Sequence, residues 1–185
     1  MQYNIIRGLL ELLCVSKEPV TEELLEEYLE KDEYFVSSIV NVISPLFPVK
    51  NGVIEPLHKS LIDWLTNQEA SHKFYISKKI AYQHLADYIS KKYANKDFKN
   101  PYVHKHFLDV LREINTQQSI SKIVSLVNDS EFMESIIDNN LFDKGLYQYI
   151  DILKYLKSND VNLDTVFESE TFKKIFIKNR RILYN

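Results

Sequence analysis

The chain of 185 residues is 45% hydrophobic and 26% charged, which is typical of a folded protein and excludes global disorder. Only 3 residues are glycine, whereas average usage gives about 13, so we expect a mainly α-helical chain with few tight turns. The formal charge of −3 gives the chain no general attraction to nucleic acid.

Charge divides the chain into two parts. Residues 1–66 contain 5 Lys or Arg and 11 Asp or Glu, a net charge of −6, and the remaining residues carry 18 basic and 15 acidic side chains, a net charge of +3. The stretch from residue 67 to 73 is the most polar one and has no low-complexity character. We therefore predict an N-terminal domain over 1–66 and a helical domain over 67–185.

Three short helices are predicted in the first domain. Apolar side chains at helical spacing indicate a helix at about 3–14. Thr21 is the expected N-cap of a second helix, and Asp32 is the expected N-cap of a third, which Pro45 ends. Glu11 interrupts the apolar run of the first helix, so an amphipathic helix is predicted there and not a signal peptide.

A β-hairpin is predicted directly after the third helix. Asn51-Gly52 lies between two short apolar runs, and this pair suits a type I′ turn because both of its central positions need positive φ. Pro48 and Pro56 restrict the flanking strands to a sheet edge. Three helices followed by a hairpin is the order of a winged helix.

Winged helices often bind DNA, but the charges here argue against that function. The third helix has no Lys or Arg between Asp32 and Phe47, and the hairpin contributes only Lys50. A DNA-binding surface needs several cationic contacts to phosphates. A nucleic-acid-binding winged helix with a helical dimerisation region remains the alternative hypothesis.

Two strings in the first domain resemble a known family. Residues 57–66 contain a His-x-Ser-x-x-Asp-Trp-Leu string, and residues 12–21 contain a leucine-rich helix end followed by Lys-Glu-Pro-Val-Thr. Both are similar to the winged-helix region of STAND-class signalling NTPases, which include the NACHT proteins, the plant resistance proteins and the apoptotic protease-activating factor. The resemblance extends over residues 9–90, where Phe74-Tyr75-Ile76 and His84-Leu85-Ala86 also fit members carrying WD or ankyrin repeats. It continues by helix spacing alone to about residue 157.

The resemblance implies roles for particular residues. In that family the histidine at the position of His58 contacts the terminal phosphate of the bound nucleotide, and an imidazole can donate to a phosphate oxygen. The alternative is that His58 caps the helix that it precedes or packs under the hairpin. Leu61, Trp64 and Leu65 share one face of that short helix, and we expect them to form an interdomain contact, with Trp64 buried against a helix over 77–93.

The sequence lacks the motifs of an NTPase core. No Gly-x-x-x-x-Gly-Lys-Ser/Thr string is present. Ser60 lies beside His58 without a Gly-x-Ser-x-Gly elbow, and His104 and His106, two residues apart on a helix, point to different faces. We therefore predict a non-enzymatic regulatory or scaffolding module with no cofactor and no metal site. Its expected partners are proteins, such as a separate NTPase core or a repeat domain.

The second domain is predicted to be a helical array or bundle. After the helix at 77–93, with Ser77 as its cap, Pro101 begins the next one. Further helices are expected at about 119–128, 130–139, 143–157 and 165–183, with Ser119, Asp129 and Asp164 as caps.

The last helix is basic, which indicates a solvated face or, alternatively, an acidic partner or a membrane surface. Its basic residues are Lys173, Lys174, Lys178, Arg180 and Arg181.

Cysteine content and hydropathy bear on location. Cys14 is the only cysteine, which excludes an intrachain disulfide or a Cys-cluster zinc site. No stretch approaches the roughly 20 apolar residues that a membrane-spanning helix needs. The expectation is a cytoplasmic protein without a membrane span.

Overall fold

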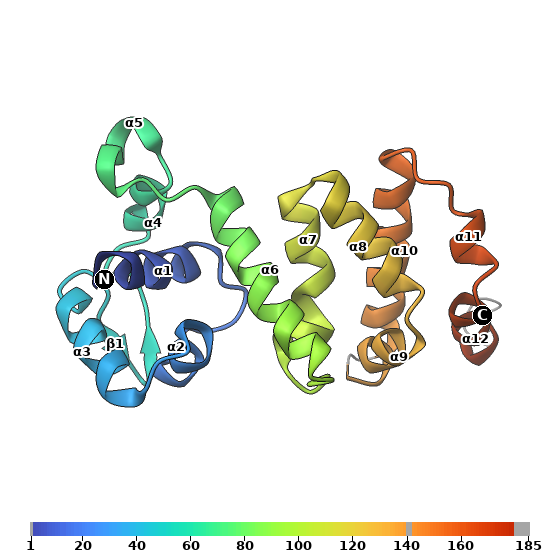
Figure 1. Cartoon of the computed structure of the whole chain (residues 1–185), viewed down its shortest axis with the longest axis horizontal. Coiled ribbons are helices and arrows are strands. Elements are labelled where there is room, and N and C mark those ends of the chain that lie inside the picture. The colour runs from blue at the N-terminus through green and yellow to red at the C-terminus, as the bar shows by residue number, and fades with distance from the viewer. Residues whose placement is uncertain (1, 140–141, 180–185) are drawn as a thin grey trace. The chain divides into compact units, whose positions relative to one another are not determined.

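The computed structural model describes residues 2–139 and 142–179, which are mainly helical with one two-stranded antiparallel sheet (Figure 1). The chain divides into two compact units, Met1–Tyr88 and Ile89–Asn185, called unit 1 and unit 2 below. The division falls within α6 (Lys78–Ala94), and not in the polar stretch from 67 to 73 where the sequence indicated a boundary.

Unit 1 begins with three helices whose predicted caps are present. The Thr21 hydroxyl accepts a hydrogen bond from the Leu24 N–H at 3.2 Å, and the Asp32 carboxylate accepts one from the Phe35 N–H at 2.9 Å. These bonds satisfy N–H groups that the first helical turn leaves without partners. The elements of unit 1 are α1 (Gln2–Val15), α2 (Glu22–Leu29), α3 (Glu33–Ile43), β1 (Val49–Lys50), β2 (Val53–Ile54), α4 (Ser60–Leu65), α5 (Gln68–Ser71), the 3₁₀ helix η1 (His72–Phe74) and most of α6.

The predicted hairpin is also confirmed. Asn51 and Gly52 have φ values of 52° and 79°, so both occupy the left-handed region that a type I′ turn requires. Val49 faces Ile54 and Lys50 faces Val53 in the antiparallel ladder. The Ile54 N–H also donates to the Val20 carbonyl at 2.8 Å, so the segment between α1 and α2 runs beside β2.

A buried carboxylate joins α1 to α6. Glu11 is only 2% exposed, and its oxygens accept hydrogen bonds from Arg7 Nε at 3.1 Å and pair with His84 Nδ1 at 2.7 Å. The Ile76 N–H donates to the Leu65 carbonyl at 2.8 Å. These bonds hold the segment that follows α4 against unit 1, which explains why the polar stretch from 67 to 73 does not end the unit.

We expect Glu11→Ala to destabilise unit 1 by about 1–3 kcal/mol, because hydrogen bonds to a charged group are lost at a buried position. Urea unfolding followed by the fluorescence of Trp64, which lies in unit 1, measures this change. Asp87 is exposed on α6, close in sequence to His84, so Asp87→Ala removes a carboxylate that is not buried and serves as the matched control. Equal effects of the two substitutions would contradict a structural role for Glu11.

Unit 2 is built around aromatic rings. Tyr93, Phe107 and Phe132 lie 5.7 to 6.2 Å apart between ring centroids, and the Tyr93 hydroxyl donates to Asp129. Burial and the Asp129 carboxylate both raise the pKa of Tyr93. The remaining elements of unit 2 are the π-helix η2 (Tyr102–His106), α7 (Phe107–Ile114), α8 (Gln117–Val127), α9 (Ser130–Asn139), α10 (Phe142–Ser158), α11 (Asp164–Phe167) and α12 (Glu170–Asn179).

Two predicted caps in unit 2 are wrong. Thr116 caps α8, and Ser119 closes a capping box from the third helical position, where its hydroxyl accepts from the Thr116 N–H. Asp164 is the first residue of α11, and its N–H donates to the Asn162 side chain. Asp129 is confirmed, since it accepts from the Phe132 N–H at 3.1 Å.

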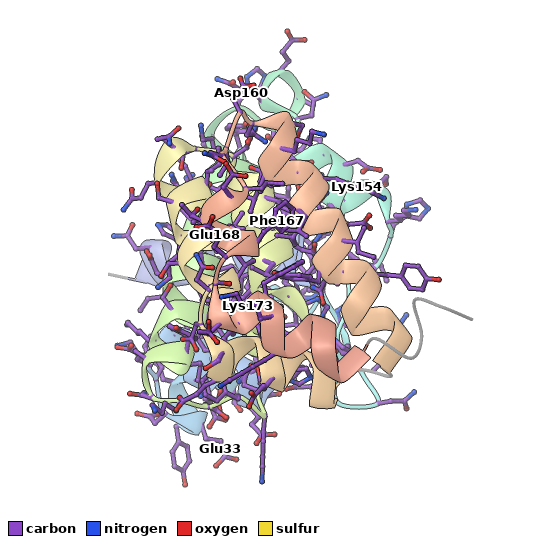
Figure 2. The ribbon with its side chains drawn as sticks, turned by 90° about the vertical axis from the view of Figure 1, so that its right-hand side faces the viewer. Glu33, Lys154, Asp160, Phe167, Glu168 and Lys173 are labelled. Carbon is purple, nitrogen blue, oxygen red and sulfur yellow. The ribbon has the colours of Figure 1, made fainter. Side chains whose placement is uncertain are left out.

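The predicted last helix at 165–183 is two helices in the structure. The Ser169 hydroxyl accepts from the Phe172 N–H at 3.1 Å, a capping bond that begins α12, and the rings of Phe167 and Phe172 pack edge to face at 5.0 Å. Figure 2 labels Phe167 and Glu168 at the end of α11 and Lys173 on α12. Lys173 and Lys174 are exposed. Arg180 and Arg181, part of the predicted basic face, lie outside the described residues.

The predicted helix after Pro101 begins as a π-helix that buries His104. The imidazole Nδ1 donates to the Phe98 carbonyl at 3.1 Å. Burial lowers the pKa of His104 below its ordinary value, and the nearby Lys105 charge adds to that effect. His106 instead packs its ring against Tyr102, at 5.8 Å between centroids, so the two histidines face different surroundings.

The lowered pKa of His104 predicts a loss of stability at acidic pH. As the pH falls below about 6.5, the unfolded chain binds a proton at this position that the folded chain still excludes, so the free energy of unfolding decreases. The thermal midpoint should therefore fall more between pH 7.5 and 5 in the unsubstituted protein than in His104→Gln. Circular dichroism at each pH measures the thermal midpoint. Parallel pH profiles for the unsubstituted protein and His104→Gln would count against this account.

Candidate functional site

A hollow of about 530 Å³ opens on unit 1. Its walls come from α1, the end of α3 with the turn that follows, α4 and η1. All but one of the lining side chains are apolar. They are Ile6, Arg7, Leu10, Val42, Ile43, Pro45, Leu46, Phe47, Leu61, Trp64, Leu65 and Phe74, and we call this feature the groove.

The α3 side of the groove is an apolar surface without charge. Residues 34–49 contain no Asp, Glu, Lys or Arg. Val42 is 64% exposed and Leu46 is 54% exposed, although α3 has a buried face of its own. Contiguous exposed apolar side chains on a folded unit are typical of a binding surface.

Two aromatic rings lie on the α4 and η1 side. Trp64 and Phe74 are 6.0 Å apart between centroids and inclined by 40°. The indole Nε1–H of Trp64 donates to the Ala70 carbonyl at 3.2 Å, so the ring has a fixed orientation. Trp64 remains 39% exposed and Phe74 remains 47% exposed, which leaves both rings available to a ligand.

The position of Trp64 corrects the prediction that it is buried against the helix at 77–93. α5 and η1 follow α4 directly, and they bring Ala70 and Phe74 to the indole in place of α6. Leu65 is buried and Leu61 is half-buried, and both line the groove with Trp64. All three residues belong to unit 1.

Trp64→Ala is expected to cost about 1–2 kcal/mol, below the roughly 3–5 kcal/mol for removing a fully buried aromatic side chain. The reason is that the indole is partly solvated in the folded protein and packs against the neighbouring Phe74 ring. Chemical unfolding followed by circular dichroism measures the change, with Phe47→Ala as the fully buried comparison. A cost for Trp64→Ala equal to that for Phe47→Ala would contradict the exposed position.

Arg7 is the one charged residue among the lining side chains. Its Nε donates to Glu11, and one terminal nitrogen donates to the Tyr75 carbonyl at 3.4 Å. These two bonds hold the guanidinium at the groove. The Lys73 ammonium lies 5.0 Å from the centre of the Phe74 ring, and Phe74 is another lining residue of the groove.

His58 is exposed, and its ring lies beside the first residue of α4, Ser60. The Ser60 N–H approaches the His58 Nδ1 at 3.3 Å, and the Ser60 hydroxyl lies 2.8 Å from the same nitrogen. A backbone N–H can only donate, so Nδ1 is the acceptor and the neutral ring carries its hydrogen on Nε2. The N-cap position of α4 is Lys59, whose side chain makes no capping bond. His58 is not enclosed by the chain. It does not line the groove.

Other chemical sites receive little support from the described residues. No group of three or more His, Cys, Asp or Glu in them has an arrangement that could hold a metal ion. Burial raises the pKa of the Cys14 thiol to about 11, which keeps it protonated and weakly nucleophilic at neutral pH. Over the same residues, none of the helices combines the length and apolar character that crossing a membrane demands.

Sequence reasoning identified part of the groove. It singled out Leu61, Trp64 and Leu65, but missed two other residues. Helical spacing placed Val42 on the apolar face of the third helix, and Leu46 was placed in the apolar run before the Asn51-Gly52 turn. The sequence signal that could have identified this surface is the absence of charged residues from 34 to 49, because a helix with only one buried face does not need so long an uncharged segment.

Comparisons with protein-family models, curated proteins and solved structures found no match to this chain.

Proposed function

We propose that this chain is a non-enzymatic regulatory or scaffolding module that binds a protein partner through the groove of unit 1. The observation that carries the proposal is the set of exposed apolar side chains around one hollow, Val42, Leu46, Trp64 and Phe74. Interfaces are enriched in aromatic residues at their centre. The groove combines such residues with a single cationic side chain, Arg7.

The proposal includes a winged-helix assignment for unit 1 and a relation to the STAND and NACHT NTPases. Its support is the element order, with three helices before the hairpin, and the Ile54 N–H bond to the Val20 carbonyl. That bond places a third extended segment beside the hairpin. The strings at 12–21 and 57–66 add the sequence resemblance.

Within this proposal, His58 binds a nucleotide phosphate only when a separate NTPase core supplies the nucleotide. The supporting feature is the tautomer, since an exposed imidazole with its hydrogen on Nε2 can donate to a phosphate oxygen. The chain alone is expected neither to hydrolyse ATP nor to bind it tightly. ATP turnover by the purified chain that His58→Ala abolishes would refute the non-enzymatic part of the proposal.

Site-specific photocrosslinking tests the protein-binding function. A photoreactive phenylalanine analogue at position 74 should form a covalent product with one polypeptide in cells, and the same analogue at position 34 should not. Tyr34 is 89% exposed and lies outside the groove, which makes it the matched control. Val42→Asp in the position-74 variant should remove the product, because a charge then enters the apolar surface.

Mass spectrometry of the product identifies the crosslinked segment. Equal products from positions 34 and 74, or a product that Val42→Asp leaves unchanged, would refute the groove as the binding surface.

A further inference from the structure

We propose that the groove binds an amphipathic α-helix of the partner protein, and that this helix carries an acidic side chain beside its apolar stripe. This inference rests on the proposed function, because it names the kind of polypeptide that the groove takes. It goes beyond that function in assigning a conformation to the partner and a recognition role to Arg7.

The groove favours a helix because it offers few hydrogen-bonding groups. Its lining comes from helices and from the turn after α3, and no residue of β1 or β2 lines it. An extended peptide needs backbone partners, such as the edge of a sheet. A helix satisfies its backbone hydrogen bonds internally, so it can enter an apolar groove without leaving polar groups unpaired.

The extent of the apolar surface favours a helix over a small ligand. A volume of about 530 Å³ also suits a small molecule. However, Val42 and Leu46 keep more than half of their surface exposed, so apolar surface continues outside the hollow. A helix with side chains at i, i+3 or i+4, and i+7 can cover both the hollow and these flanking residues.

The Arg7 guanidinium favours an acidic residue on that helix. A guanidinium has five N–H donors, and the bonds to Glu11 and Tyr75 engage only two of the Arg7 nitrogens. The fixed orientation leaves donors for a carboxylate, which Arg binds with defined geometry. Lys73, beside the Phe74 ring, is a second cationic side chain near a lining residue, although residues 1–66 as a whole are acidic.

Selection from a phage-displayed library of random peptides, in both helical and extended scaffolds, tests the inference with the full chain as target. Trp64 is the only tryptophan, so a shift of its emission to shorter wavelength reports that a tryptophan-free peptide covers the groove. The selected binders should be helical, with an apolar stripe and an adjacent Glu or Asp. Replacing that residue by Lys should weaken binding about tenfold or more, as expected for a charge-assisted hydrogen bond.

Substitutions in the chain give the matched comparison. Leu46→Glu and Phe74→Glu should abolish binding of the selected peptide, and Tyr34→Glu, outside the groove, should not change it. Arg7→Gln should remove most of the difference between the Glu and Lys peptides. Because Arg7 also contacts Glu11, circular dichroism of this variant is compared with that of the unsubstituted chain, and the charge-swapped peptide tests the pairing without altering the fold.

The failures of the two proposals are distinguishable. Groove-dependent binders that are extended, or that tolerate Lys in place of the acidic residue, would overturn the helix inference and leave the protein-binding function standing. A selection without any groove-dependent peptide would overturn both. If oleate shifts the Trp64 emission and no peptide does, the groove binds a lipid-like anion and the inference is wrong.

Discussion

Unit 1 depends on a carboxylate that its fold removes from water. Glu11 lies on α1 at 2% exposure, and such a group is stable there only because Arg7 and His84 supply hydrogen bonds. His84 belongs to α6, so its hydrogen bond with Glu11 holds α6 against α1 within unit 1. The same arrangement orients Arg7, whose other bond reaches the Tyr75 carbonyl. The buried group and the groove edge are therefore coupled through one guanidinium.

The groove follows from how short elements are joined after the hairpin. α4, α5 and η1 succeed one another with few intervening residues, so Trp64 meets Ala70 and Phe74 and not a long helix. The short elements do not cover the rings of Trp64 and Phe74 as a long helix would. Unit 1 therefore keeps these apolar side chains exposed beside the Arg7 guanidinium. This combination is the basis of the proposed protein-binding function.

The core of unit 2 is of a different kind. Its centre consists of aromatic rings in edge-to-face contact, with Tyr93 bonded to the cap residue Asp129. The π-helix η2 buries His104, whose imidazole donates a hydrogen bond to the Phe98 carbonyl. Burial lowers the pKa of this imidazole, which is why the stability of the unit is expected to decrease at acidic pH.

Local chemistry in the sequence determined the helices, the hairpin and several caps. Thr21, Asp32 and Asn51-Gly52 act within a few residues of themselves, so their roles can be predicted from the chain alone. The cap of α8 was misassigned by three residues because Thr116 and Ser119 form a reciprocal pair, in which either hydroxyl has the features of an N-cap. The sequence pattern predicted one continuous helix over 165–183. The break before α12 was missed because the helical spacing gave no sign that Ser169 would cap a new helix.

Only the tertiary structure decided the boundary of unit 1, the exposure of Trp64 and the groove itself. Each depends on contacts between residues far apart in sequence, such as Glu11 with His84. A helical pattern shows that Val42 and Trp64 are apolar, but it does not show whether another element covers them. The sequence therefore determined which surfaces were apolar, and the packing of α1, α3, α4 and η1 determined which of them stayed open, because burial is a property of neighbours and not of the residue alone.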